Sequence, residues 1–224
     1  MKILVLGATG GTGAAVVAEL LTRGHDVTAF SRHAESLLDS RTSPSLRAIT
    51  GDATDPAAVD NAVAGQDAVV IALGITENPF RVRLLGPAHT AMNVRSHGTS
   101  NVVAAMRRHN VRRLLVLSVY GIGPTAGRLR LSDKIFYPLV IGNQVADHIR
   151  QEEIVRRSGL DWTIAQPVHL SDEEGPTPAL VSPAGEVGGW HVPRTAVGRV
   201  FADTLEKSAY IGESIAVSAA APGH

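Results

Sequence analysis

The sequence contains no cysteine, which excludes disulfide bonds, zinc–thiolate centres and a cysteine nucleophile. Its 21 basic and 21 acidic residues give a formal net charge of zero, so charge does not favour nucleic acid or an anionic membrane surface as a partner. No apolar run is long enough to cross a bilayer, and the opening run KILVLG is too short for a secretory signal. We therefore expect a cytoplasmic protein that acts on a small molecule.

Lysine is also scarce, since Lys2, Lys134 and Lys207 are the only lysines among the 21 basic residues. Scarce lysine restricts the classes of dehydrogenase to which the chain can belong. Dehydrogenases that interconvert alcohols and ketones pair a tyrosine with a lysine four residues later. A tyrosine whose pKa keeps its ordinary value of about 10 is a poor proton donor at neutral pH unless a nearby cation lowers it.

A candidate proton-handling site lies in the stretch VLSVYGIGP (116–124), where an apolar run ends in Ser118 and Tyr120. Position 124, four residues after that tyrosine, is a proline. Of the three lysines, Lys134 is the one that we expect could approach from elsewhere. The missing lysine argues against alcohol dehydrogenase chemistry. It does not argue against hydride transfer to a conjugated acceptor, because the charge is delocalised and water can supply the proton.

Strands and helices alternate along most of the chain. Short apolar runs predict strands at 2–6, 26–30, 46–52, 67–74, 112–119 and 161–167, and helical spacing predicts helices at 14–23, within 90–109 and at 147–159. This order predicts an α/β fold, a doubly wound, Rossmann-like parallel sheet in one domain spanning 1–224. From residue 168 on we expect a small C-terminal embellishment, with a helix near 194–207 and a strand at 214–218.

Three glycines, Gly7, Gly10 and Gly13, lie between the first strand and the first helix. In dinucleotide-binding folds the first glycine permits a tight turn, and the second lets the backbone approach the pyrophosphate. The third lets the helix pack closely on the strand. The phosphates then lie at the helix N-terminus. A plain turn between strand and helix is the alternative, but the flanking elements favour dinucleotide binding.

The end of the second strand carries Ser31 and Arg32, where an NAD-dependent enzyme places an acidic residue for the ribose 2′-hydroxyl. A carboxylate would repel a 2′-phosphate, whereas a guanidinium binds one with paired, charged hydrogen bonds. The alternative is that Arg32 is a solvated loop residue. Because the strand end sets its position, we predict NADPH as the cofactor.

Several longer stretches carry a family resemblance: GATGGTG (7–13), VAGQDAVVIALG (63–74), NVVAAM (101–106), DHIR (147–150), SGL (158–160) and QPVHLSD (166–172). In these stretches the chain resembles the NAD(P)H-binding, NmrA-like branch of the atypical short-chain dehydrogenases. Within that branch it is similar to NADPH-dependent flavin reductases of the biliverdin reductase B type. The glycine motif marks only the superfamily, and the later stretches together are more specific.

The resemblance implies a set of site residues. It assigns cofactor contacts to Gly7, Thr9, Gly10, Gly11, Thr12, Ser31, Arg32, Asp52, Ala53, Leu73, Gly74, Ser118 and Pro167. It makes His169 a wall of the acceptor pocket, with Ser118 and Tyr120 as the other candidate catalytic residues. The flavin reductases have two consecutive hydroxyl residues after the fifth strand, whereas this chain has Ser118 and Val119. The second position is therefore vacant, or Tyr120 takes it.

Four residues have both a structural and a functional interpretation. Without the resemblance, His169 would be a surface or packing residue. Tyr120 belongs either to the core or to the pocket, and we favour the pocket because residues beyond the strand ends line the crevice. His148 and Glu152 lie one helical turn apart, but no third ligand accompanies them. We expect a surface contact between them and no metal site.

The sequence therefore predicts an NADPH-dependent reductase of a flavin or a similar conjugated acceptor, such as a bilin or quinone. A non-catalytic NAD(P)H-binding regulator of the NmrA type is the alternative. A sugar-nucleotide epimerase or dehydratase is disfavoured, because it needs the tyrosine–lysine pair and a larger substrate domain.

Overall fold

The computed structural model describes residues 1–40, 43–75, 90–130, 142–173 and 178–220. They form an eight-stranded sheet in the order β3-β2-β1-β4-β5-β6-β10-β8. Its strands are β1 (Lys2–Leu6), β2 (Asp26–Ser31), β3 (Leu46–Thr50), β4 (Ala68–Ile71), β5 (Arg113–Leu117), β6 (Asp161–Pro167), β8 (Ala179–Ser182) and β10 (Glu213–Ala219). Every neighbouring pair is parallel except β10 with β8. The predicted doubly wound, Rossmann-like fold is confirmed.

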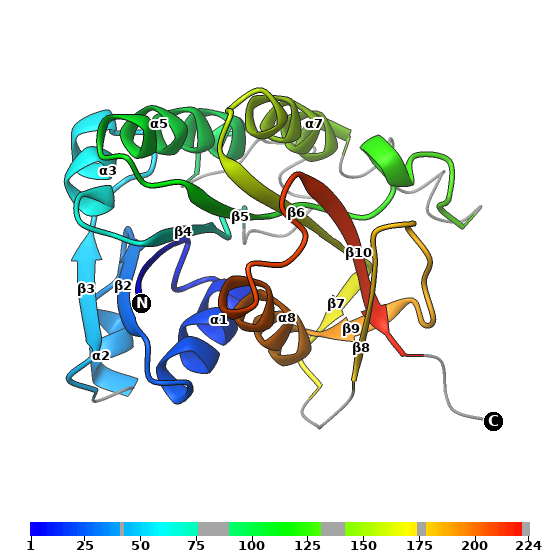
Figure 1. Ribbon diagram of the computed structural model, residues 1–224, viewed down its shortest axis with the longest axis horizontal. Helices are drawn as coiled ribbons and strands as arrows, with labels where there is room; N and C mark the ends of the chain where they lie inside the picture. The colour runs from blue at the N-terminus through cyan, green and yellow to red at the C-terminus, as the bar shows by residue number, and fades with distance from the viewer. Residues whose placement is uncertain (41–42, 76–89, 131–141, 174–177, 221–224) are drawn as a thin grey trace.

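Helices cover both faces of the sheet (Figure 1). One face carries α1 (Gly11–Thr22) and α8 (Arg194–Glu206), and the other carries α3 (Pro56–Val63), α5 (Val94–Arg108) and α7 (Gly142–Arg156). The remaining elements are α2 (Ser36–Ser40), the 3-10 turn η1 (Gly123–Thr125) and a small parallel sheet of β7 (His169–Ser171) and β9 (His191–Pro193). Two separate apolar clusters result, one under each helical layer.

The central strands are apolar along their whole length because both of their faces are covered. All four residues of β4 are buried, as are residues 3–6 of β1. Side chains that alternate along β1 enter opposite layers, so Val5 packs beneath α1 while Leu6 packs beneath α3 and α5. This arrangement holds the carboxyl ends of β1, β4, β5 and β6 side by side.

Two glycines of the first loop are required by the backbone itself. Gly7 has a φ of +79°, and a Cβ there would lie 2.4 Å from the carbonyl oxygen of Ala72. A Cβ on Gly13 would lie 2.1 Å from the carbonyl oxygen of Gly7. The first glycine therefore permits the turn and the third permits close helix–strand packing, as the sequence predicts.

The C-terminal region is more integrated than the sequence suggests. Strand β10 pairs in parallel with β6 and so extends the main sheet, and α8 packs against α1. Among the described residues, β8 adds an antiparallel edge strand to the main sheet, and β7 and β9 form the small separate sheet. The sixth predicted strand matches β6 at both ends, whereas α7 begins at Gly142, five residues before the predicted 147. None of the helices in the described ranges is long and apolar enough to cross a membrane.

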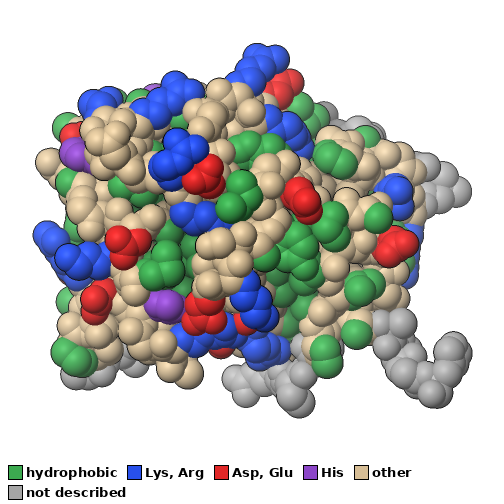
Figure 2. Space-filling model, viewed as in Figure 1, with side chains coloured by type: hydrophobic (Ala, Val, Ile, Leu, Met, Phe, Trp, Pro, Cys, Tyr) green, Lys and Arg blue, Asp and Glu red, His purple; other side chains and the backbone are tan. Residues whose placement is uncertain are grey.

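Charged side chains of both signs are intermixed over the face in Figure 2. That mixture agrees with the equal numbers of acidic and basic residues in the sequence.

Candidate functional site

A cleft of about 730 Å³ runs along the carboxyl edge of the sheet, within the usual volume range of small-molecule sites. It is lined by the predicted residues Gly7, Thr9, Gly10, Gly11, Thr12, Ser31, Arg32, Asp52, Ala53, Leu73, Gly74, Ser118, Pro167 and His169. Residues from the ends of six strands (β1 to β6) and the loops after them thus meet in one space. Ligands of open parallel sheets bind at this edge.

The start of α1 provides backbone donors for an anion. Gly10 precedes the helix without a side-chain cap, and no acidic residue lies in the first turn. The Gly7 carbonyl accepts from the Gly10 amide at 3.0 Å, which fixes the loop in its tight form. The N–H groups at an uncapped helix start, together with the helix dipole, favour a negatively charged group. The residues present therefore fit a dinucleotide pyrophosphate.

The ends of β2 and β3 shape the part of the cleft predicted for the adenosine. Arg32 is exposed, and its Nη2 donates to Thr90 Oγ1 at 2.9 Å. Asp52 accepts from both the amide and the hydroxyl of Thr54 at 2.8 Å. These bonds lower the pKa of Asp52, chiefly through the Thr54 amide and more weakly through the charge of Arg32. Asp52 is thus an ionised turn residue beside the arginine.

Ser118, directly after β5, forms a hydroxyl–carboxylate pair with Glu152 of α7. Ser118 Oγ donates to Glu152 Oε1 at 2.6 Å. Gln166 Nε2 donates to the same oxygen at 2.8 Å, and Arg156 Nη2 lies 2.7 Å from Glu152 Oε2. Glu152 is 1% exposed, so these donors compensate a buried charge. Because the hydroxyl proton points at Glu152, the oxygen of Ser118 is left as a hydrogen-bond acceptor toward the cleft.

The expected surface contact between His148 and Glu152 is wrong. Glu152 is buried against Ser118, and His148 lines the cleft from α7. Burial of the imidazole and the positive charge of Arg95 hold the pKa of His148 well below its ordinary value, against a hydrogen bond with Gln151. The many charged residues of α7 suggested a solvated helix, but α7 packs against α5, and the face that carries His148 and Glu152 turns inward. Only tertiary packing reveals that Glu152 belongs behind Ser118.

The predicted pocket position of Tyr120 is also wrong. Tyr120 is 2% exposed and belongs to the apolar cluster beneath α1 and α8. Its hydroxyl donates to the Gly185 carbonyl at 2.9 Å, and its ring stands edge-on to Trp190. Burial raises its pKa despite the charge of Arg128. This phenol is a core hydrogen-bond donor and is absent from the lining of the cleft.

The end of β6 and the following turn close the other side of the cleft. Pro167 ends the strand, and His169 follows with its amide donating to the Trp190 carbonyl at 3.2 Å. His169 lies within 5.7 Å of His191, ring centre to ring centre. Both Pro167 and His169 line the cleft, as predicted.

Two arginines of the lining were missed from the sequence. Arg194, at the start of α8, lies over the glycine loop, since a Cβ on Gly11 would be 2.8 Å from its Nε. Arg194 also pairs with Asp172. Arg95, in the first turn of α5, is 6% exposed. Neither belongs to a recognisable motif, so no sequence signal marks them. Lys134 lies outside the described residues.

A doubly wound sheet with a glycine-rich strand–helix turn and a cleft at its carboxyl edge defines a dinucleotide-binding Rossmann-like protein. The sequence pattern of the NAD(P)H-binding family matches residues 7–208. The chain belongs to that family. Among the described residues, no group of three or more His, Cys, Asp or Glu side chains could hold a metal ion.

Several known proteins are similar to the chain. An uncharacterised chloroplast protein of Arabidopsis thaliana is 29% identical over 99% of this chain and 78% of its own length. The 2-alkyl-3-oxoalkanoate reductase of Stenotrophomonas maltophilia is 38% identical, but the match spans 53% of this chain and 33% of that enzyme.

Solved structures that share the fold include the two described next. ChuY, an anaerobilin reductase from Escherichia coli O157:H7, superposes with a TM-score of 0.79 at 20% identity, covering 100% of both chains. A short-chain dehydrogenase/reductase from Veillonella parvula, solved in complex with NADP, gives a TM-score of 0.78 at 22% identity over 99% of this chain and 95% of its own.

Proposed function

We propose that this protein is an NADPH-dependent oxidoreductase that passes hydride to a flavin or a similar conjugated acceptor, such as a bilin or quinone. The proposal places it in the NmrA-like branch, near the flavin reductases of the biliverdin reductase B type. The observation that carries it is that one cleft contains both an uncapped, glycine-rich helix start and Ser118, whose oxygen can accept a hydrogen bond. Family membership supports the cofactor class, and Arg32 supports the choice of NADPH.

Different parts of the cleft bind different parts of the cofactor and the acceptor. The glycine loop and the start of α1 hold the pyrophosphate, and Arg32 holds the 2′-phosphate. Ser118, oriented by Glu152, accepts a hydrogen bond from the nicotinamide end or from the acceptor. When bound, the cofactor supplies the hydride. His169 orients the acceptor from the opposite wall, and water supplies the proton.

The position of Tyr120 supports a conjugated acceptor over a simple ketone. A ketone becomes an alkoxide that needs an acid at its oxygen, and the phenol that the sequence offers is committed to Gly185 in the core. A flavin or bilin spreads the added charge over a conjugated system and relies mainly on orientation beside the nicotinamide.

The test follows NADPH absorbance with flavins, bilins, quinones and simple ketones, beside calorimetric titration of NADPH. We expect turnover with one of the conjugated classes and little with ketones. Fast ketone reduction that is lost in Lys134→Ala would contradict the choice of acceptor. Tight NADPH binding without turnover on any acceptor would favour the alternative, a regulator of the NmrA type.

A further inference from the structure

The cleft contains a buried arginine that makes no side-chain hydrogen bond with any described residue. Nε and Nη1 of Arg95 are both buried and unpartnered, as is Nδ1 of His148, and both side chains line the cleft. Native proteins satisfy nearly all buried polar atoms, and a buried charge without hydrogen bonds is destabilising. The two open donors of Arg95 in the cleft indicate a ligand that accepts hydrogen bonds from them.

The neighbouring carboxylate does not fill this role. Asp147 accepts from the backbone amides of Arg95 and Ser96 at 3.0 and 3.2 Å and from the Ser96 hydroxyl. It therefore caps the first turn of α5, and no hydrogen bond joins it to the Arg95 guanidinium among the described residues. Burial lowers the pKa of Arg95 to about 10, with the charge of Asp147 acting in the opposite direction. Arg95 is thus fully charged at neutral pH.

These donors approach the cleft from the side away from the predicted phosphates. Arg95 and His148 come from α5 and α7, whereas the pyrophosphate site is at the start of α1, on the other face of the sheet (Figure 1). Arg95 Nη2 would lie 3.6 Å from a Cβ on Gly74, at the end of β4. The open donors of Arg95 therefore lie beside the predicted cofactor contact Gly74, on the side of the cleft away from the predicted pyrophosphate.

We infer that Arg95 and His148 form a binding subsite for a carboxylate carried by the hydride acceptor. A planar guanidinium matches a planar two-oxygen anion. The neighbouring neutral imidazole of His148 adds no second positive charge and can donate to the anion only in the tautomer that carries the proton on Nδ1. One buried positive charge balances a monoanion, and the carboxylate of Asp147 nearby disfavours a phosphate dianion. The inference rests on the proposed function, which supplies the conjugated hydride acceptor. It adds that this acceptor carries a carboxylate group.

The test compares biliverdin, which carries carboxylates, with its dimethyl ester, which does not. We expect wild type to favour the acid and Arg95→Met to raise the KM of the acid about ten- to a hundredfold while leaving that of the ester unchanged. Arg95→Lys keeps the charge without the planar fork and should retain part of the preference. The control is Arg112→Met, which removes an exposed arginine paired with Asp161 at the opposite edge. A comparison of the KM values for FMN, which carries a phosphate, and riboflavin, which does not, shows whether the subsite prefers a phosphate to a carboxylate.

A second measurement separates binding from a structural role. If Arg95 is held open for a ligand, Arg95→Met should melt at the wild-type temperature or above, because a buried charge is replaced by an apolar side chain of similar length. Lower melting, with acid and ester affected alike, would overturn the inference, and so would equal use of acid and ester by wild type. If no flavin, bilin or quinone is reduced, the proposed function fails. The binding of the two bilins can then be measured by fluorescence titration. Tighter binding of the acid than of the ester, abolished by Arg95→Met, would still support the carboxylate subsite.

Discussion

The two edges of the sheet use buried arginines in opposite ways. Arg113, at the amino edge, is 8% exposed and Arg95, at the carboxyl edge, is 6% exposed, and burial lowers the pKa of each to about 10. Arg113 donates to the carbonyls of Asp161 and Ala209 at 2.8 Å, to that of Thr204 at 3.3 Å and to Thr163 Oγ1 at 2.9 Å. The Arg95 guanidinium makes no such bond with the described residues.

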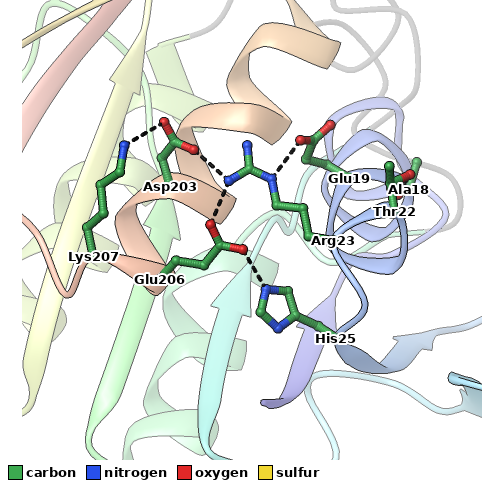
Figure 3. Close-up of polar contacts among 8 residues, drawn as sticks. All are labelled: Ala18, Glu19, Thr22, Arg23, His25, Asp203, Glu206 and Lys207. Atoms are coloured by element: carbon green, nitrogen blue, oxygen red, sulfur yellow. Dashed lines mark hydrogen bonds and ion pairs between the residues drawn. The ribbon is translucent and has the colours of Figure 1, made fainter.

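A second arginine of the amino edge extends the contrast. Arg23, at the end of α1, donates to Glu19 at 2.8 Å, to Asp203 at 2.6 Å and to Glu206 at 2.7 Å. His25 and Lys207 complete this network between α1 and α8 (Figure 3). The amino edge thus uses its arginines to connect elements. The carboxyl edge leaves Arg95 open, which is typical of a functional site that sacrifices stability.

The largest expected effect is on stability at the amino edge. Arg113→Met should lower the free energy of unfolding by about 2–4 kcal/mol, because it removes four hydrogen bonds to buried or partly buried acceptors. Urea unfolding measures the change, and calorimetry should show unaltered NADPH affinity. If Arg95→Met destabilised the protein as much as Arg113→Met, the contrast between the two edges would not hold.

The next effect is on cofactor choice at the carboxyl edge. Arg32→Ala should weaken NADPH about ten- to a hundredfold and leave NADH almost unchanged, since a charged hydrogen bond to the 2′-phosphate is lost. Calorimetric titration with both cofactors measures it. An equal loss of affinity for the two cofactors would mean that Arg32 does not contact the 2′-phosphate of NADPH.

Arg194→Ala is the matched variant at the same edge. Because Arg194 lies over the glycine loop, where both cofactors carry a pyrophosphate, NADPH and NADH should weaken alike, by about tenfold. The same titrations apply. A loss confined to NADPH would move Arg194 to the 2′-phosphate and remove the distinction from Arg32.

The smallest effect is on the ion network of Figure 3. Arg23→Gln should cost about 1 kcal/mol of unfolding free energy at pH 7. The hydrogen bond from Arg23 holds the pKa of Glu206 below its ordinary value, opposed by partial burial and aided by His25. A carboxyl whose folded pKa is lowered stabilises the fold above its unfolded pKa and loses that contribution as pH falls through the folded value.

The difference between wild type and Arg23→Gln should therefore shrink below about pH 4. Urea unfolding at several pH values measures it. Arg112→Gln, which breaks the more exposed pair with Asp161, is the control and should cost less. A penalty for Arg23→Gln that stays constant down to acid pH would assign its effect to packing.

Local patterns predicted much of the fold and of the cofactor side of the cleft. The apolar runs, the glycine spacing and Arg32 at the strand end are each read within a short window of sequence. The same patterns failed for Tyr120, since its neighbours along the chain do not show which face of the chain turns inward beyond β5. They also failed for Glu152, whose charged surroundings on α7 hid its burial.

The sequence by itself determined the alternation of strands and helices, the glycine loop at the start of α1 and the balance of charge. These properties depend on hydrophobic period and local backbone sterics, which neighbouring residues decide. Only the tertiary structure decided that Glu152 lies behind Ser118, that Arg194 covers the glycine loop and that Arg95 is buried without a partner. Each depends on how helices distant in sequence pack around one sheet edge, and a residue's burial and hydrogen bonds are fixed only when those surfaces meet.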